Sequence, residues 1–124
     1  FRHAVGSSNN FGNKDKSSYQ MDYGNSKEAI REAELDISEG ADMIMVKPGL
    51  PYLDIISKLN QKFDIPIFAY QVSGEYSMIM NAINNGLLDR SVILETLTSF
   101  KRAGCSGILT YFAPIVSKIL NEDK

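Results

Sequence analysis

The sequence predicts an α/β fold in which helices alternate with the strands of a parallel sheet. Three short apolar runs support this prediction, at residues 43–46, 65–72 and 107–111, with helix-like patterns between them. The first run is too continuously apolar for a half-exposed strand and too short for a helix, which is typical of a strand buried on both faces. Strands alternating with helices favour a parallel sheet with right-handed crossovers.

The composition is that of an ordinary globular domain. The chain has 124 residues, of which 44% are hydrophobic and 23% charged, so it is about one domain long and can bury a core. A formal net charge of -2, with scattered cations, argues against a nucleic-acid partner. No apolar run reaches the ~20 residues that a membrane-spanning helix needs, so a soluble protein is expected. The single cysteine, Cys105, excludes an internal disulfide and is interpreted as a small packing residue.

Residues 1–24 are predicted to form a long polar loop, and residues 25–124 a single domain. Residues 6–16 contain two glycines, three asparagines and two serines, which suit neither a core strand nor a long helix. Several side chains could hold a substrate carboxylate if this loop closes over a site as a lid: Arg2, Lys14, Lys16, Tyr19 and Gln20. Composition alone favours a flexible polar tail.

A helix is predicted between Asn25 and Gly40. Asn25, with Glu28 three residues later, makes a capping pair, and Gly40 is a helix stop. The apolar residues of this segment recur at helical spacing: Ile30, Ala33 and Ile37. The helix leads directly into the first strand.

The following segment repeats the same alternation. Pro51 suits the first turn of a helix that ends near Lys62, and the strand at 65–72 closes on Ser73. The next helix is predicted to end at Asn85–Gly86, with an apolar stripe on one face: Met78, Ile79, Ala82 and Ile83.

Two further helices complete the pattern. Asp89 is predicted to cap a helix that Gly104 ends. The third strand then runs from Gly107 to Tyr111, and Pro114 starts a last helix through Leu120.

Lys47 is the candidate catalytic residue. It lies at the carboxyl end of the first strand, which is the catalytic face of α/β barrels. A desolvated, neutral amine there could attack a carbonyl and form a Schiff base. Ser73 and Tyr111 end the other two strands on the same face. A solvated strand end or a salt-bridge partner is the structural alternative for Lys47.

Three βα units do not complete a barrel. An eight-stranded barrel needs ~250 residues, so this chain is either a small open sheet or a piece of a larger barrel. Neither alternative is excluded by the periodicity of the sequence.

Several motifs resemble the C-terminal part of the 5-aminolevulinate dehydratase (porphobilinogen synthase) family. The similarity covers essentially the whole chain, and the motifs occur in the family's order. They are Phe1-Arg2, Tyr19-Gln20-Met21-Asp22, Met43-Ile44-Met45-Val46-Lys47-Pro48-Gly49-Leu50-Pro51-Tyr52-Leu53-Asp54, Tyr70-Gln71-Val72-Ser73-Gly74-Glu75-Tyr76 and Leu109-Thr110-Tyr111-Phe112-Ala113-Pro114.

The resemblance implies the C-terminal part of a (β/α)8 TIM barrel that condenses two 5-aminolevulinate molecules to porphobilinogen, a precursor of haem and chlorophyll. Lys47 matches the second of the family's two Schiff-base lysines. Ser73 and Tyr111 match the hydroxyls that bind the carboxylate of the same substrate, and Tyr70 matches the aromatic residue beside the Schiff base. The strand with the family's first Schiff-base lysine is missing here, so the 124-residue chain alone is expected to be nearly inactive.

The same resemblance assigns roles in residues 1–24. Arg2, Lys16 and Gln20 match lid residues that clamp the carboxylate of the second substrate. Phe1 matches an apolar wall of that pocket. Lys16 stands where an Arg or a Lys would serve as the cation, although a Lys lacks the bidentate fork of guanidinium.

The resemblance gives only partial expectations about bound metals, subunit assembly and cellular compartment. Glu32 matches a carboxylate that binds a regulatory magnesium, although on its own it would be interpreted as a solvent-facing helix residue. Cys105 is the single cysteine and His3 the single histidine of the chain, so the chain offers no zinc site of the usual kind. Whether the whole enzyme depends on zinc stays open. The family forms a homo-octamer, and the cytoplasm and the plastid are both open as compartments.

Two other functions compete with the dehydratase. A noncatalytic half-barrel could bind an anionic small ligand at the helix N-termini after Ser73 and Tyr111. Another Schiff-base aldolase would share Lys47 but would leave the Tyr19-Gln20-Met21 and Val72-Ser73-Gly74-Glu75 motifs unexplained.

Overall fold

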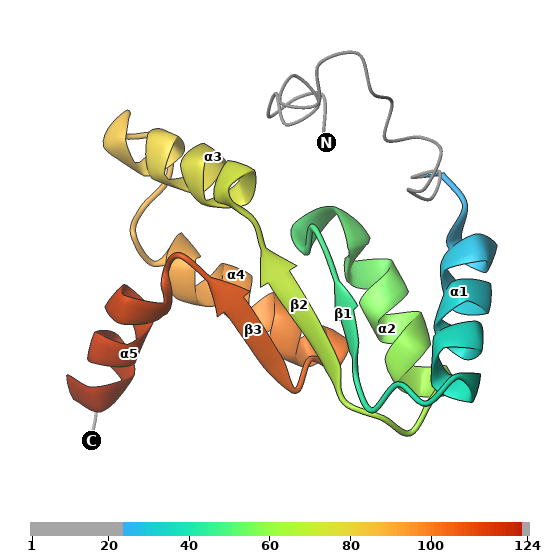
Figure 1. Cartoon of the computed structure of the whole chain (residues 1–124). Coiled ribbons are helices and arrows are strands. Elements are labelled where there is room, and N and C mark those ends of the chain that lie inside the picture. The colour runs from blue at the N-terminus through green and yellow to red at the C-terminus, as the bar shows by residue number, and fades with distance from the viewer. Residues whose placement is uncertain (1–23, 123–124) are drawn as a thin grey trace, which may run out of the picture.

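The structure, a computed structural model, describes residues 24–122. These residues form a three-stranded parallel sheet with helices (Figure 1). The elements are α1 (Ser26–Ser38), β1 (Ile44–Val46), the 3-10 turn η3 (Leu50–Tyr52), α2 (Leu53–Lys62), β2 (Ile67–Gln71), α3 (Ser73–Asn84), α4 (Val92–Ala103), β3 (Gly107–Thr110) and α5 (Ala113–Glu122). The predicted α/β class and the alternation of strands and helices are confirmed.

The strands follow one another across the sheet in chain order. The order is β1-β2-β3, and both pairs are parallel. Val46 pairs with Ala69, and Tyr70 pairs with Leu109. All three strands therefore end at the same edge, with α2 crossing from β1 to β2 and α3 and α4 from β2 to β3.

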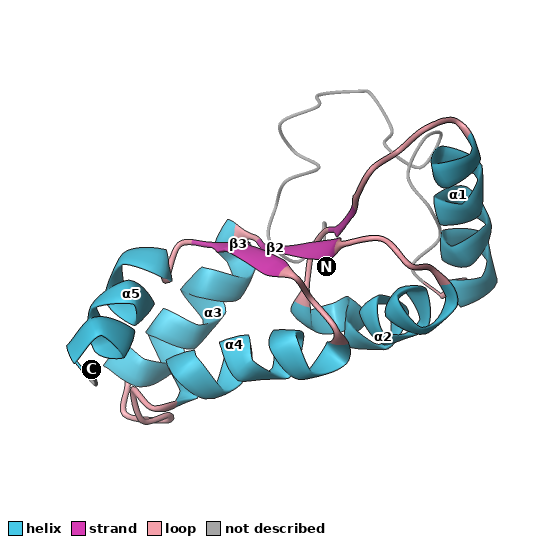
Figure 2. Cartoon of the chain, turned by 90° about the horizontal axis from the view of Figure 1, so that it is seen from below, coloured by secondary structure: helices cyan, strands magenta, loops and turns pink. Residues whose placement is uncertain are grey.

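The core lies between the sheet and the helices below it in Figure 2. Ile56 of α2, Phe100 of α4 and Ile67 of β2 are all fully buried. α2 and α4 bury the apolar faces that helical spacing predicts, and burying such a face provides most of the stability of these helices.

The opposite face of the sheet is open. Met45 and Leu109 project from this face and are 47% and 45% exposed. The prediction that the first strand is buried on both faces is therefore wrong for the described residues. Within 24–122, helices pack against one face of the sheet only.

The ends of α1 and α4 have clear chemical causes. The side chain of Asn25 accepts a hydrogen bond from the backbone N–H of Glu28 at 3.0 Å, as predicted. Gly104 ends α4 in the left-handed region, with φ of 118°, where glycine is favoured. The side chain of Asn60 also occupies the space that a Cβ at Gly104 would need.

Two predicted details of the helices need correction. α2 begins at Leu53, because residues 50–52 form a 3-10 turn first. Ser91 rather than Asp89 is the N-cap residue of α4. Asp89 instead accepts hydrogen bonds from Ser91 and Arg90, and these bonds lower the pKa of its carboxyl.

The predicted apolar stripe of α3 is only partly buried. Ile79 is 7% exposed, but Met78 is 61% exposed. α3 lies beyond the end of the sheet (Figure 1), so it packs through a narrow face. Among residues 24–122, no helix is long and apolar enough to cross a membrane.

Candidate functional site

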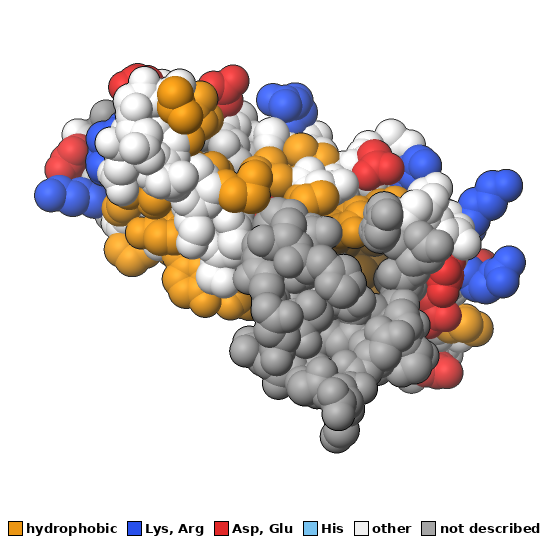
Figure 3. Space-filling view, turned by 90° about the horizontal axis from the view of Figure 1, so that it is seen from above, with side chains coloured by type: hydrophobic (Ala, Val, Ile, Leu, Met, Phe, Trp, Pro, Cys, Tyr) orange, Lys and Arg blue, Asp and Glu red, His pale blue; other side chains and the backbone are white. Residues whose placement is uncertain are grey.

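The carboxyl ends of the three strands bring the predicted residues to one rim. Lys47 directly follows β1, Tyr111 directly follows β3, and Ser73 is the first residue of α3. Figure 3 looks onto this end of the molecule, where hydrophobic side chains form an interrupted patch among polar ones. The predicted convergence of the three strand ends is confirmed.

Lys47 and Tyr70 form the centre of this rim. The Nζ atom of Lys47 lies 5.8 Å from the centre of the Tyr70 ring, within the range of a cation–π contact. Parallel pairing of Val46 with Ala69 explains this proximity, because Lys47 and Tyr70 are the next residues along the two strands. Lys47 is exposed rather than enclosed, since the sheet face beside it is open.

Tyr111 extends the site from Tyr70 to β3. A side-chain hydrogen bond to Tyr70 raises the pKa of the Tyr111 phenol, with smaller contributions from the charge interaction with Tyr70 and from burial. The phenol therefore stays protonated at neutral pH and can donate to a carboxylate. A hollow of about 390 Å³ lies here, lined by Tyr70, Ile108, Leu109, Thr110, Tyr111 and Ala113.

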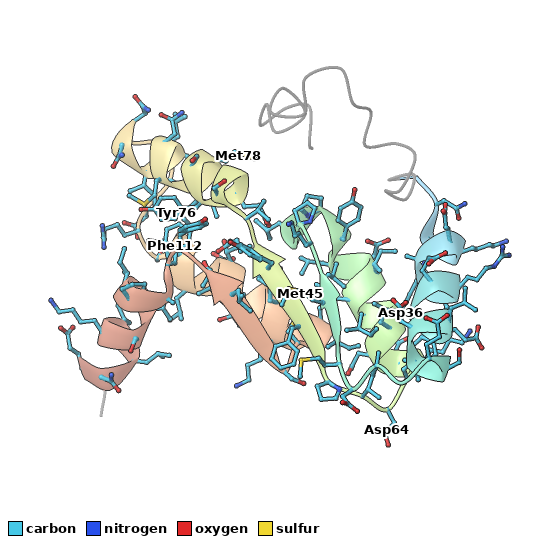
Figure 4. The ribbon with its side chains drawn as sticks, viewed as in Figure 1. Asp36, Met45, Asp64, Tyr76, Met78 and Phe112 are labelled. Atoms are coloured by element: carbon cyan, nitrogen blue, oxygen red, sulfur yellow. The ribbon has the colours of Figure 1, made fainter. Side chains whose placement is uncertain are left out.

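Tyr76 of α3 makes two aromatic contacts just beyond the end of β3, one with Tyr111 and one with Phe112. The ring of Tyr76 lies 5.8 Å from that of Tyr111, at an interplanar angle of 55°. Tyr76 also packs on Phe112, with 4.7 Å between ring centres (Figure 4). Such tilted pairs are a favourable aromatic geometry. Phe112 is fully buried, so it anchors the chain immediately after Tyr111.

Glu75 is a buried residue of the rim to which the sequence analysis gave no role. Its side chain is 1% exposed. Oε1 accepts a hydrogen bond from the N–H of Leu50 at 2.6 Å, and Oε2 accepts from those of Gly49 at 3.1 Å and Val72 at 2.7 Å. A glutamate at the third position of a helix was the available signal, because that position favours a bond back to the N-cap N–H.

Gln71 ties the ends of β2 and β3 together. It is fully buried, and its Oε1 accepts a hydrogen bond from the Thr110 hydroxyl at 2.6 Å. The Thr110 oxygen in turn accepts from the N–H of Phe112 at 3.1 Å. The Nε2 of Gln71 has no hydrogen-bond partner among the described residues.

The remaining predicted residues differ in where they lie. Ser73 lies on the same rim and is exposed at the first turn of α3. Glu32 is exposed on α1, which precedes the first strand. Most of the 1–24 segment lies outside the described part of the chain. So do the predicted lid residues: Phe1, Arg2, Lys16 and Gln20.

The chemistry of Glu32 fits only a largely hydrated metal ion. Within residues 24–122, no group of three or more His, Cys, Asp or Glu side chains could hold a metal. Magnesium, however, usually keeps several waters and takes one or two carboxylates. An exposed single carboxylate meets that requirement, and it would hold such an ion away from Lys47.

The parallel βα units, the open sheet face and the amine at a strand end define a segment of an α/β barrel with a lysine on its catalytic rim. Residues 1–119 match the family model described as Delta-aminolevulinic acid dehydratase. The chain belongs to this family.

Individual relatives agree with the family match. The chain is 54% identical over 121 residues to Delta-aminolevulinic acid dehydratase of Rhodobacter capsulatus, covering 97% of this chain and 36% of the relative. It is 59% identical over 120 residues to the protein of the same name from Methanothermus sociabilis, covering 96% and 37%. The chain thus spans about a third of the length of these relatives.

A solved structure shows the same fold. The crystal structure of delta-aminolevulinic acid dehydratase (porphobilinogen synthase) from Toxoplasma gondii ME49, in complex with the reaction product porphobilinogen, aligns with a TM-score of 0.88 and 52% identity. The alignment covers 91% of this chain and 32% of the other. The predicted fold, the C-terminal part of a (β/α)8 barrel, is confirmed.

Proposed function

We propose that this chain provides part of the active site of a 5-aminolevulinate dehydratase, a lyase that condenses two 5-aminolevulinate molecules to porphobilinogen in haem and chlorophyll synthesis. Membership of the family supports this proposal, as does the porphobilinogen complex of the structural relative. The observation that carries it is the position of the Lys47 amine, 5.8 Å from the Tyr70 ring centre at the carboxyl ends of the strands.

Lys47 acts as the nucleophile. Its uncharged amine attacks the substrate ketone, a C–N bond forms, and the ketone oxygen leaves as water to give a Schiff base. The Tyr70 ring packs beside the new double bond. Since Tyr70 also bonds to Tyr111, the reacting carbon and the group that binds the acid tail have fixed relative positions.

Ser73 and Tyr111 bind the substrate carboxylate. Both hydroxyls are exposed at the rim that carries Lys47, and a hydroxyl that bonds a charged oxygen makes a stronger bond than one to a neutral group. Holding the acid tail orients the ketone toward the amine, which lowers the entropic part of the barrier.

The other expected roles complete the proposal. Arg2, Lys16 and Gln20, on a lid at residues 1–24, bind the carboxylate of the second substrate beside Phe1. Glu32 binds a regulatory magnesium ion through waters, and the whole enzyme is a homo-octamer. Residues 1–124 alone lack the family's first Schiff-base lysine, so they trap one substrate molecule without turnover.

Borohydride trapping tests the proposal. The protein is reduced in the presence of 5-aminolevulinate, and the adduct is located by peptide mass mapping. We expect a stable adduct on Lys47, which Lys47→Arg abolishes. The matched control, Lys58→Arg on α2, keeps the adduct.

Two results would contradict the dehydratase assignment. The first is an adduct on a residue of this chain other than Lys47. The second is saturable binding of 5-aminolevulinate without any adduct, which would instead favour a noncatalytic half-barrel that binds an anionic small ligand.

A further inference from the structure

We propose that Glu75 is a positioning residue that fixes Lys47 relative to Ser73; this inference rests on the proposed function. One carboxylate bonds to the turn after Lys47 and to the turn before Ser73. It is therefore a direct side-chain connection between the rim ends of β1 and β2, in addition to the backbone pairing of the two strands.

The three bonds of Glu75 account for its burial. A buried carboxylate is costly unless it is hydrogen-bonded. Two N–H groups of the Lys47 turn and one at the N-cap of α3 provide those bonds. Glu75 also lies in the first turn of α3, where the helix dipole favours negative charge.

No cation is needed to hold this charge. The ion pair within residues 24–122 joins Lys62 to Glu34, far from the rim, and no cation pairs with Glu75 in that part of the chain. The Lys47 amine lies over Tyr70 instead. Glu75 thus acts on the backbone after Lys47 and leaves the amine available for substrate.

The turn after Lys47 is held from two sides. Gly49 is buried, and a Cβ at this position would overlap the ring of Phe100, so α4 supports the turn from below. Glu75 binds the N–H groups of Gly49 and Leu50 from the side of α3. Because the Lys47 side chain is exposed, this turn, more than packing around the amine, determines where the amine lies.

The N-cap bond extends the restraint to Ser73. Oε2 accepts from the N–H of Val72 and from that of Gly49 at the same time. A shift of either turn would break one of these bonds. The amine that forms the Schiff base and the hydroxyl that binds the carboxylate are thereby kept at a constant separation.

Glu75→Gln is the informative variant. The amide is nearly the same size, but one acceptor oxygen becomes an NH2 group that faces backbone N–H donors. At least one of the three bonds is then lost. A displacement of about 1 Å can cost 10²-fold in rate, so we expect the rate of borohydride trapping at Lys47, at saturating 5-aminolevulinate, to fall about 10- to 100-fold.

The experiment uses the longest form of the protein that its gene encodes. Ile56→Val, a fully buried change on α2, is the matched control for lost stability. We expect it to lower the unfolding temperature and leave the trapping rate unchanged. Glu75→Asp keeps the charge on a shorter side chain and should trap at an intermediate rate, and it replaces Glu75→Gln if the latter does not fold.

The outcomes separate the inference from the proposed function. If the unmodified protein traps substrate on Lys47 and the Glu75 variants trap it equally fast, the positioning role is wrong and the proposed function stands. If the unmodified protein gives no Lys47 adduct, both are wrong. The positioning role would also be wrong if Ile56→Val lowered the trapping rate together with the unfolding temperature, as the Glu75 variants do.

Discussion

The Tyr70 side chain raises the pKa of the Tyr111 phenol above its ordinary value of 10.0, chiefly through a hydrogen-bonding interaction between the two side chains at the ends of β2 and β3. This interaction stabilises the protonated phenol of Tyr111. Its contribution is fully present below pH 10 and is lost as the pH rises through the raised pKa. The carboxylate-binding form of Tyr111 therefore persists across the whole neutral range.

Replacing Tyr70 should show that the raised pKa of Tyr111 depends on the Tyr70 hydroxyl. Tyr70→Phe keeps the ring beside Lys47 but removes the hydroxyl, so the pKa of Tyr111 should fall toward its ordinary value. An ultraviolet titration of tyrosinate formation measures the change. Tyr76→Phe is the control, because Tyr76 contacts Tyr111 through its ring. Equal shifts in both variants would contradict the assignment of the bond.

Ser73 should affect substrate binding rather than folding. A hydrogen bond to a charged group contributes about 1.5–3 kcal/mol, so Ser73→Ala should raise the KM for 5-aminolevulinate about 10- to 100-fold. Ser77→Ala, another exposed serine of α3, should leave the KM unchanged. Steady-state kinetics of the longest form of the protein that its gene encodes compares the two variants, and an unchanged KM in Ser73→Ala would remove Ser73 from the site.

Thr110 should affect stability. Thr110→Val leaves the Gln71 Oε1 and the Phe112 N–H without their partner, which should lower the free energy of unfolding by about 1–3 kcal/mol. Urea denaturation measures the loss. Thr98→Val, on the exposed side of α4, should change stability by at most about 0.5 kcal/mol. A similar effect at both positions would show that the Gln71 connection contributes little.

Gly49 and Phe100 should be energetically coupled. Gly49→Ala places a methyl group in the Phe100 ring, and overpacking of this kind costs about 1–3 kcal/mol of stability. Phe100→Leu shortens the side chain and relieves the overlap. The double variant should therefore lose less stability than the sum of the two single variants, as measured in a double-mutant cycle. Strict additivity would mean that the backbone moves away instead.

Cys105 should react slowly with thiol reagents. Partial burial raises the pKa of its thiol, and only the thiolate is nucleophilic. At pH 8 the reaction with a disulfide reagent should be slower than after unfolding in urea, and its rate should rise with pH beyond the range of an ordinary cysteine. A fast reaction of the folded protein would contradict the burial.

Local signals in the sequence were sufficient for most of the fold. Asn25 and Gly104 mark helix ends through chemistry confined to a few neighbouring residues. The apolar runs place all three strands, although each strand is shorter than the run that predicts it, β1 and β3 by one residue and β2 by three. Because parallel strands end at one edge, the convergence of Lys47, Ser73 and Tyr111 also follows from the order of the elements.

Contacts between distant segments could not be predicted in the same way. The bonds of Glu75 reach residues 25 and 26 positions away, and the bond between Thr110 and Gln71 spans 39 positions. No periodic pattern encodes such pairs. A local signal can also mislead. Asp89 is of a type strongly preferred at the N-cap position, but the N-cap residue of α4 is Ser91, two residues later.

The two ends of the sheet carry different kinds of residue. In residues 24–122, every residue assigned to chemistry other than Glu32 lies at or just beyond the carboxyl end of a strand. The turn before β2 carries Asp64, which is exposed at the far end (Figure 4). A fluorophore or an immobilisation tag attached through a cysteine at that position would leave the reactive end unobstructed. Asp64 is thus a natural handle for tethering the molecule while substrate reaches it from the other side.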